Sequence, residues 1–265
     1  MTSALPVSAY EINKMPEKER ERLLSVLIPS RFLEIFSIDS GSFLNTAGIR
    51  CVKFACPEGM PFFQIDLRRD PADRDAAYFL DISTSPYGQM EISFIIVNDP
   101  DSERYDIDVD EYGQDTYFGT ARRNIYEEIR ALEAGLAPAQ VRKGLRAMRD
   151  LIACWDDFFG RIGHRFYFLE PLSYNSAILY ERGGFQYVQG REKMEYIDRE
   201  FRPGGVLHAR LDGSTPFRKP EHWKTVRGRS WAIHDGILDE PWESPKMYKT
   251  VGIDGGICTF TGEGY

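Results

Sequence analysis

The stretch 175–190 reads NSAILYERGGFQYVQG and decides more about the fold than any other part of the chain. It predicts a short helix that ends at Arg182, because two glycines follow and glycine readily takes the left-handed conformation that ends helices. A helix that ends in Gly-Phe places the ring of Phe185 in the core and turns directly into a strand. Tyr180 is then expected on the opposite side of the helix, facing a cleft.

Regular elements are predicted on both sides of this helix. Residues 164–169 read as a strand, and residues 185–188 and 193–197 read as two more. A long helix that begins near Pro138 is expected before them, and a shorter helix at 120–133. Seven apolar residues of the long helix recur at alternating spacings of four and three, which makes one buried stripe: Val141, Leu145, Met148, Ile152, Trp155, Phe159 and Ile162.

The first half of the chain reads as an antiparallel meander, because short turns join its apolar runs. Its expected strands are 49–54, 62–67, 77–82, 90–97 and 105–110. In the last run three aspartates alternate with apolar residues, a pattern that also suits solvated charges on a sheet edge. Residues 48–198 together predict an α/β (α+β) fold with one mixed, mostly antiparallel central sheet and helices on both faces.

The composition and periodicity of the sequence change twice along the chain, which suggests three parts. Residues 1–47 read as a loose lead-in followed by a helix. Residues 48–200 form the predicted sheet domain. Residues 201–265 are irregular and rich in Trp, Gly and Pro, and we expect them to pack on the sheet domain as an extension.

Composition and charge exclude several classes of protein. The chain has 265 residues, 42% of them hydrophobic, and a formal net charge of -8, which disfavours a general nucleic-acid binder. No apolar run approaches the roughly 20 residues that span a bilayer, and no signal peptide is expected at the N-terminus. Four cysteines are too few for a disulfide scaffold. We therefore expect a cytoplasmic protein without a membrane or nucleic-acid partner, and a homodimer is left open.

The opening stretch resembles the C-terminal motif of the GCN5-related N-acetyltransferase (GNAT) superfamily, N-x-x-A-x-x-L-Y-E-x-x-G-F. Leu179, Tyr180, Glu181, Gly184 and Phe185 match its spacing, and the helix also carries Asn175 and Ala177, each nearer to Leu179 than the motif places it. The expected order of elements agrees over 48–198. The resemblance implies a GNAT-like sheet and transfer of an acyl group, most often acetyl, from acyl-CoA to an amine. The acceptor would be a small-molecule amine or a protein amine that attacks the thioester directly.

The superfamily also carries a phosphate loop, Q/R-x-x-G-x-G/A, at the start of the long helix, where backbone amides and the helix dipole hold the coenzyme A pyrophosphate. The nearest match is 141–146, VRKGLR, in which Gly144 is the middle glycine and Arg146 replaces the second small residue. The resemblance implies an acetyl-CoA or other acyl-CoA co-substrate, held by Arg142, Lys143, Gly144, Arg146 and Asn175. Alternatively, the cations of this stretch are only a solvated helix face.

Two residues are candidates for catalysis. The resemblance implies that Tyr180 protonates the departing thiolate, although a tyrosine here also fits a core position. Glu170, at the end of strand 164–169, is the favoured general base for the amine, and its alternative is a surface carboxylate. Glu91, Asp106 and Asp108 are further candidate bases.

No metal is expected, because the histidines after residue 200 are scattered and lack neighbours at ligand spacing. The sequence thus leaves three readings: an N-acyltransferase, a non-catalytic GNAT-fold binding module with an eroded phosphate loop, or an acyltransferase with another acceptor. The first two differ at 141–146. Amides that face a cleft favour catalysis, whereas amides in helical hydrogen bonds favour the binding module.

Overall fold

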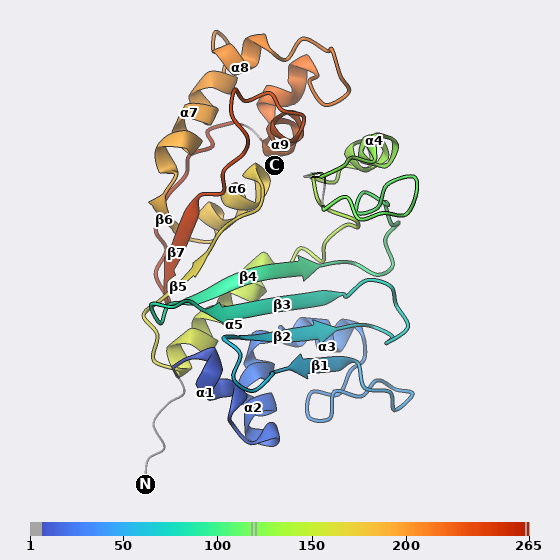
Figure 1. Ribbon diagram of the computed structural model, residues 1–265, viewed down its shortest axis with the longest axis vertical. Helices are drawn as coiled ribbons and strands as arrows, with labels where there is room; N and C mark the ends of the chain where they lie inside the picture. Colours follow the sequence, from blue (N-terminus) through green and yellow to red (C-terminus); the bar gives the residue numbers. More distant parts are fainter. Residues whose placement is uncertain (1–6, 118, 120, 263, 265) are drawn as a thin grey trace. The chain divides into compact units, whose positions relative to one another are not determined.

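The computed structural model describes residues 7–117, 119, 121–262 and 264 (Figure 1). The first six residues of the predicted lead-in lie outside it. The strands are β1 Val52–Ala55, β2 Phe62–Leu67, β3 Tyr78–Thr84, β4 Met90–Val97, β5 Phe166–Leu169, β6 Gln186–Gln189 and β7 Lys246–Thr250. The helices are α1 Ala9–Asn13, α2 Glu17–Leu24, η1 Ser25–Leu27, α3 Ser30–Ile35, α4 Ile125–Glu133, α5 Met148–Arg161, α6 Tyr174–Arg182, α7 Arg191–Phe201, α8 Val206–Ala209, η2 Pro220–Lys224 and α9 Val226–His234.

The strands form one sheet in the order β1-β2-β3-β4-β5-β7-β6. Strands β1 to β4 are antiparallel neighbours, whereas β4 and β5 are parallel. The predicted mixed, mostly antiparallel sheet flanked by helices is therefore confirmed. No helix in the described ranges is long and apolar enough to cross a membrane.

The chain divides into two compact units, which are described separately. Unit 1 contains the chain up to Asp101, Gly144–Leu169 and Tyr248–Asp254. Unit 2 contains Ser102–Lys143, Glu170–Met247 and the chain from Gly255. The chain thus leaves unit 1 after β4 and returns to it at Gly144, just before α5.

Unit 1 is built on the meander and α5. Strands β2 and β3 alternate buried and half-buried residues, as period-two amphipathic strands do. From α5, Phe158 packs edge-on against Phe63 of β2, with 6.0 Å between ring centroids. Phe159 stacks on Tyr167 of β5 at 4.4 Å. Helix α5 is therefore fixed against β2 and β5 by its aromatic face.

Unit 2 has its own aromatic centre at α9. Trp231 is fully buried, stacks on Phe217 with 5.2 Å between ring centroids, and donates its indole N–H to the carbonyl of Leu136. Tyr105 and Ile107 lie in the same cluster. The helices of unit 2 are α4 and α6 to α9, together with η2 (Figure 1).

Three predicted elements are wrong. Residues 105–110 form no strand, because Tyr105 and Ile107 enter the core of unit 2 while Arg104 pairs with Asp106 and Asp108. Residues 193–197 belong to α7 rather than to a strand.

The misleading alternation at 193–197 is short, and the buried residues Met194, Ile197 and Phe201 follow helical spacing instead.

The third wrong element is the start of the long helix. Residues 138–147 are irregular, and α5 begins at Met148. The predicted helix at 120–133 is shorter than expected, and Asn124 caps it by accepting the N–H of Glu127. Thr120 lies outside the described residues. The long apolar stripe therefore overestimated the helix by almost three turns at its N-terminal end.

Candidate functional site

The candidate site of unit 1 is the first turn of α5, beside the carboxyl end of β4. A Cβ placed on Gly144 would lie 3.2 Å from the carbonyl oxygen of Val97, the last residue of β4, so the two backbones are close. Helix α5 leads into β5, which pairs parallel to β4 through Glu91 and Ile92. In open α/β sheets, ligands bind at the carboxyl ends of such parallel strands.

The backbone of this turn is rich in unused donors. Among the described residues, no hydrogen bond is donated by any backbone N–H from Gly144 to Asp150, and the first helical bond runs from Leu151 to Ala147. No side chain caps α5, whose N-cap is Ala147. A helix start of this kind presents several N–H groups and the positive end of the dipole to an anion.

Arg146 has the backbone conformation that its motif position favours for glycine. Its φ is +54°, in the left-handed region that residues with a Cβ rarely adopt. The sequence motif places a small residue at this position. Arg146 thus places a cation at a backbone conformation in which a glycine would be relaxed.

The cations of this turn are free. Arg146 and Arg149 are exposed, and neither pairs with a carboxylate among the described residues. The nearby Asp150 lies 3.6 Å from Arg31. Two arginines without carboxylate partners, next to unbonded backbone donors, suit a phosphorylated ligand.

Arg142 and Lys143 belong to unit 2 and have different surroundings. The guanidinium of Arg142 donates to the carbonyl of Ser102, and the backbone N–H of Lys143 donates to the Ser102 hydroxyl at 3.2 Å. These bonds join the two ends of the segment 102–143. Arg142, predicted as a phosphate ligand, therefore has a structural contact, while the side chain of Lys143 is exposed.

Tyr180 lies in α6 and is 6% exposed. Its ring packs against Phe185, with 5.2 Å between centroids, and therefore does not lie on the opposite side of the helix as expected. Phe185 is fully buried, as the Gly-Phe ending predicts.

Asn175, also in α6, accepts a hydrogen bond from the Ser230 hydroxyl at 2.6 Å, which ties α6 to α9.

Glu170, the predicted base, is a partly exposed carboxylate. Its side chain is 46% exposed and lies 3.8 Å from the ammonium of Lys246. Glu181, next to Tyr180 in the sequence, is instead fully enclosed and accepts hydrogen bonds from Tyr187 and from Thr259, twice. Burial, followed by the neighbouring Glu181 charge, raises the pKa of Tyr187 above its ordinary value.

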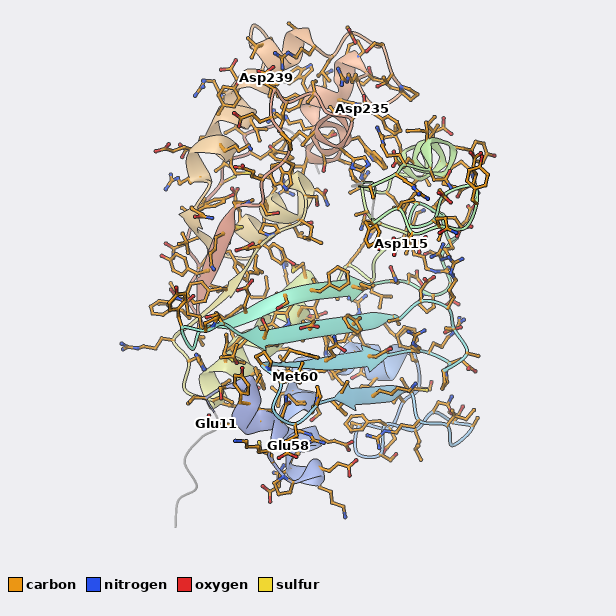
Figure 2. All side chains as sticks on the ribbon, viewed as in Figure 1. Glu11, Glu58, Met60, Asp115, Asp235 and Asp239 are labelled. Atoms are coloured by element: carbon orange, nitrogen blue, oxygen red, sulfur yellow. The ribbon has the colours of Figure 1, made fainter. Side chains whose placement is uncertain are left out.

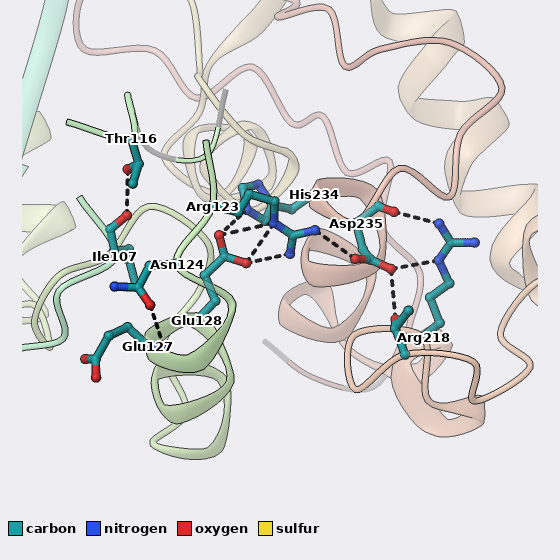
Figure 3. Close-up of polar contacts among 10 residues, drawn as sticks. Ile107, Thr116, Arg123, Asn124, Glu127, Glu128, Arg218, His234 and Asp235 are labelled. Atoms are coloured by element: carbon teal, nitrogen blue, oxygen red, sulfur yellow. Dashed lines mark hydrogen bonds and ion pairs between the residues drawn. The ribbon is translucent and has the colours of Figure 1, made fainter. Parts of the chain in front are cut away.

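A cluster of charged side chains in unit 2 was not found from the sequence (Figure 3). Arg123 donates to Glu128 Oε2 from Nη2 at 2.5 Å and from Nε at 2.9 Å, and its Nη1 donates to Asp235 at 2.9 Å. Asp235 also accepts from Arg218 at 2.9 Å, and a ring nitrogen of His234 lies 3.2 Å from Glu128. We call these five residues the charge cluster. The adjacent His234 and Asp235 at the end of α9 were its only visible signal.

The charge cluster is balanced. Its two arginines face two carboxylates, and the side chain of Glu128 is 3% exposed. Burial alone would raise the pKa of Glu128, but hydrogen bonds from His234 and Arg123 outweigh it and hold that pKa below the ordinary value. Burial opposes the bonds from Arg123 and Thr215 in the same way at Asp235, whose pKa is also lowered. Such satisfied charges hold α4 and α9 together.

No group of three or more His, Cys, Asp or Glu side chains in the described ranges is arranged to hold a metal ion. In the comparisons with known proteins, no family model, curated protein or solved structure matches the chain.

Proposed function

We propose that the protein is an N-acyltransferase that uses acetyl-CoA or another acyl-CoA, and that the coenzyme's pyrophosphate binds at the first turn of α5. One observation carries the proposal: seven consecutive backbone N–H groups, Gly144 to Asp150, donate no hydrogen bond to the described residues at the uncapped start of a 14-residue helix. The cations of Arg146 and Arg149 add charge-assisted donors to the same turn.

The proposed reaction is a direct transfer. The acceptor amine, in its neutral form, attacks the thioester carbonyl carbon, the C–S bond breaks, and the coenzyme leaves as a thiolate. In the proposal Tyr180 gives that thiolate its proton and Glu170 takes the proton that the amine loses. Asn175, through its bond to Ser230, orients the start of the helix that carries Tyr180. Arg142 and Lys143 remain proposed contacts; the side chain of Lys143 is exposed, whereas Arg142 donates to the carbonyl of Ser102.

The proposal is tested by calorimetric titration of the pure protein with acetyl-CoA. We expect saturable binding that inorganic pyrophosphate competes away, because both ligands need the amides of the same turn. The double variant Arg146→Ala, Arg149→Ala should bind at least tenfold more weakly. Arg165→Ala is the matched control, since Arg165 is another exposed arginine of unit 1 without a carboxylate partner among the described residues. Absence of binding at millimolar acetyl-CoA would overturn the proposal.

Turnover is measured separately, as free thiol released in the presence of a panel of primary amines. Release that depends on the amine supports transfer. Tight coenzyme binding without release from any amine favours the binding module over the enzyme.

A further inference from the structure

Unit 2 has a groove of about 420 Å³ between α7, α8 and the segment that follows α9. Its floor is apolar and consists of Tyr196, Ile197, Leu207 and Leu238. Its rim is charged and consists of Glu192, Lys193, Asp239 and Glu240. Figure 2 labels Asp239, which marks the segment after α9. The volume falls in the range of about 300–1,000 Å³ that small-molecule sites occupy.

The floor presents apolar surface for a ligand to cover. Ile197 and Leu207 are 0% and 1% exposed and form the fixed base of the groove, so the apolar area that a ligand can cover belongs to Leu238 and Tyr196. Leu238 is half-buried, and Tyr196 is 36% exposed with the guanidinium of Arg199 over its ring at 5.3 Å. An alkyl or aryl group laid on this floor would remove apolar area from water on both sides.

The rim has an uncompensated negative charge. Asp239 pairs with Arg210 at 2.7 Å, and the ammonium of Lys193 lies 3.9 Å from Glu243 and 3.4 Å from the carbonyl of Pro241. Glu192 and Glu240 are exposed, and neither has a cationic partner among the described residues. The one ammonium of the rim is therefore engaged, while two carboxylates remain for a ligand.

We propose that this groove binds a small organic cation with an apolar body, such as a primary amine on an alkyl or aryl chain. The ammonium pairs with Glu192 and Glu240, and the apolar body covers Leu238 and Tyr196, above the buried Ile197 and Leu207. A bare metal cation would leave the apolar floor exposed to solvent, and an anion would be repelled by the carboxylates of Glu192 and Glu240. The inference does not depend on the proposed function, because the groove lies wholly in unit 2 and needs no coenzyme.

The test uses three probes that separate charge from body. They are 4-phenylbutylamine, the uncharged 4-phenylbutan-1-ol, and methylammonium, which has the charge without the body. Binding is followed through the methyl NMR signals of Ile197, Leu207 and Leu238. We expect the arylalkyl amine to bind at least tenfold more tightly than either other probe, as measured by these signals. Its affinity should fall with added salt.

The double variant Glu192→Gln, Glu240→Gln should weaken amine binding at least fivefold and leave the fold intact, because both side chains are exposed. Glu195→Gln is the matched control on the same helix, where Glu195 pairs with Arg191 outside the groove. Equal binding of alcohol and amine, an unchanged affinity in the double variant, or shifts confined to other methyl groups would overturn the proposal. None of these results affects the acetyl-CoA titration.

Discussion

The first turn of α5 and the charge cluster of unit 2 both gather arginines, but they use them in opposite ways. In the charge cluster Arg123 and Arg218 have buried carboxylate partners, and the burial that would raise the pKa of Glu128 and Asp235 is outweighed by hydrogen bonds. At α5, Arg146 and Arg149 have no carboxylate partner among the described residues.

This difference distinguishes two roles of a cationic side chain in a protein, which are to stabilise the fold and to bind a ligand. A satisfied buried network contributes to folding, and removal of one member leaves another charge buried and unpaired. Exposed cations beside unbonded amides contribute little to folding, and in the proposed function those of α5 bind the coenzyme. Substitutions in the charge cluster should therefore lower the stability of the fold, whereas substitutions at the first turn of α5 should lower the affinity for acetyl-CoA.

The largest effect is expected on turnover in Tyr180→Phe. If Tyr180 protonates the thiolate, turnover should fall by about 10²–10⁴-fold, as general acid catalysis typically provides. The Michaelis constant for the coenzyme should move far less, and the free energy of unfolding should change by about 1 kcal/mol. The measurement is steady-state kinetics with an amine found in the panel.

A Phe variant with full turnover and a lowered melting temperature would instead make Tyr180 a packing residue against Phe185. That outcome would remove Tyr180 from the proposed mechanism and sharpen the contrast between unit 2 and the first turn of α5.

Arg123→Ala should lower the free energy of unfolding by about 3–5 kcal/mol, because Glu128 and Asp235 lose their shared partner inside the protein. Urea unfolding measures the change. Arg161→Ala is the control, since Arg161 pairs with Asp157 on the exposed surface of α5 and should cost no more than about 1 kcal/mol. The affinity of the folded Arg123→Ala variant for acetyl-CoA should be unchanged. A loss of affinity would contradict the separation between a cluster that stabilises the fold and a turn that binds the coenzyme.

The double variant Arg146→Ala, Arg149→Ala should show the reverse pattern. Acetyl-CoA should bind at least tenfold more weakly, while the free energy of unfolding stays within about 0.5 kcal/mol of the parent, because neither side chain has a carboxylate partner to lose. Calorimetry and urea unfolding on the same samples decide this. Equal affinity of the variant and the parent would move the phosphate site elsewhere.

Acid should destabilise the charge cluster, whereas Arg146 and Arg149 have no carboxylate partner among the described residues to lose. The native pKa values of Glu128 and Asp235 are lowered, so their contribution to stability is complete above the unfolded carboxyl pKa of about 4 and is lost as the pH falls through the lowered native values. Urea unfolding between pH 7 and pH 2 should reveal the loss. Arg123→Ala should flatten this part of the curve, and an unflattened curve would assign it to other carboxylates.

The smallest effect concerns the backbone of Arg146. Arg146→Gly and Arg146→Ala remove the same charge, so both should weaken acetyl-CoA binding equally. Glycine also relaxes the left-handed conformation at φ +54°, which costs residues with a Cβ about 1–2 kcal/mol, and part of this gain is offset by the freer unfolded chain. The glycine variant should therefore be more stable than the alanine variant by about 0.5–1 kcal/mol in urea unfolding. Equal stability would contradict this account.

Sequence pattern predicted most of unit 1 and less of unit 2. Strands β2 and β4 match their predicted bounds, because Phe62–Leu67 and Met90–Val97 are apolar runs closed by turn residues. The end of α6 at Arg182 also matches, because Gly183 and Gly184 follow. The predicted strand at 105–110 was wrong because its alternating residues lie in a loop. Tyr105 and Ile107 of this loop enter the core of unit 2, and Asp106 and Asp108 pair with Arg104.

The candidate site could be found only in part. Gly144 and Arg146 were identified from the loop motif, but the late start of α5 was not, because Val141 and Leu145 continue the apolar stripe outside the helix. The charge cluster was missed because Arg123 and Asp235 lie more than a hundred residues apart, and their contact depends on tertiary packing that no local period records.

Each unit is built from segments that lie far apart in the sequence, and this affects how the chain folds during translation. Unit 1 needs Tyr248–Asp254, and unit 2 needs the threonines that bind two buried carboxylates: Thr259 on Glu181 and Thr261 on Asp198. Neither unit is complete while the ribosome is still adding residues before 248. Until late in translation the growing chain therefore has an unfinished sheet, and Glu181 and Asp198 lack their threonine partners. Incomplete states of this kind expose apolar surface that favours aggregation.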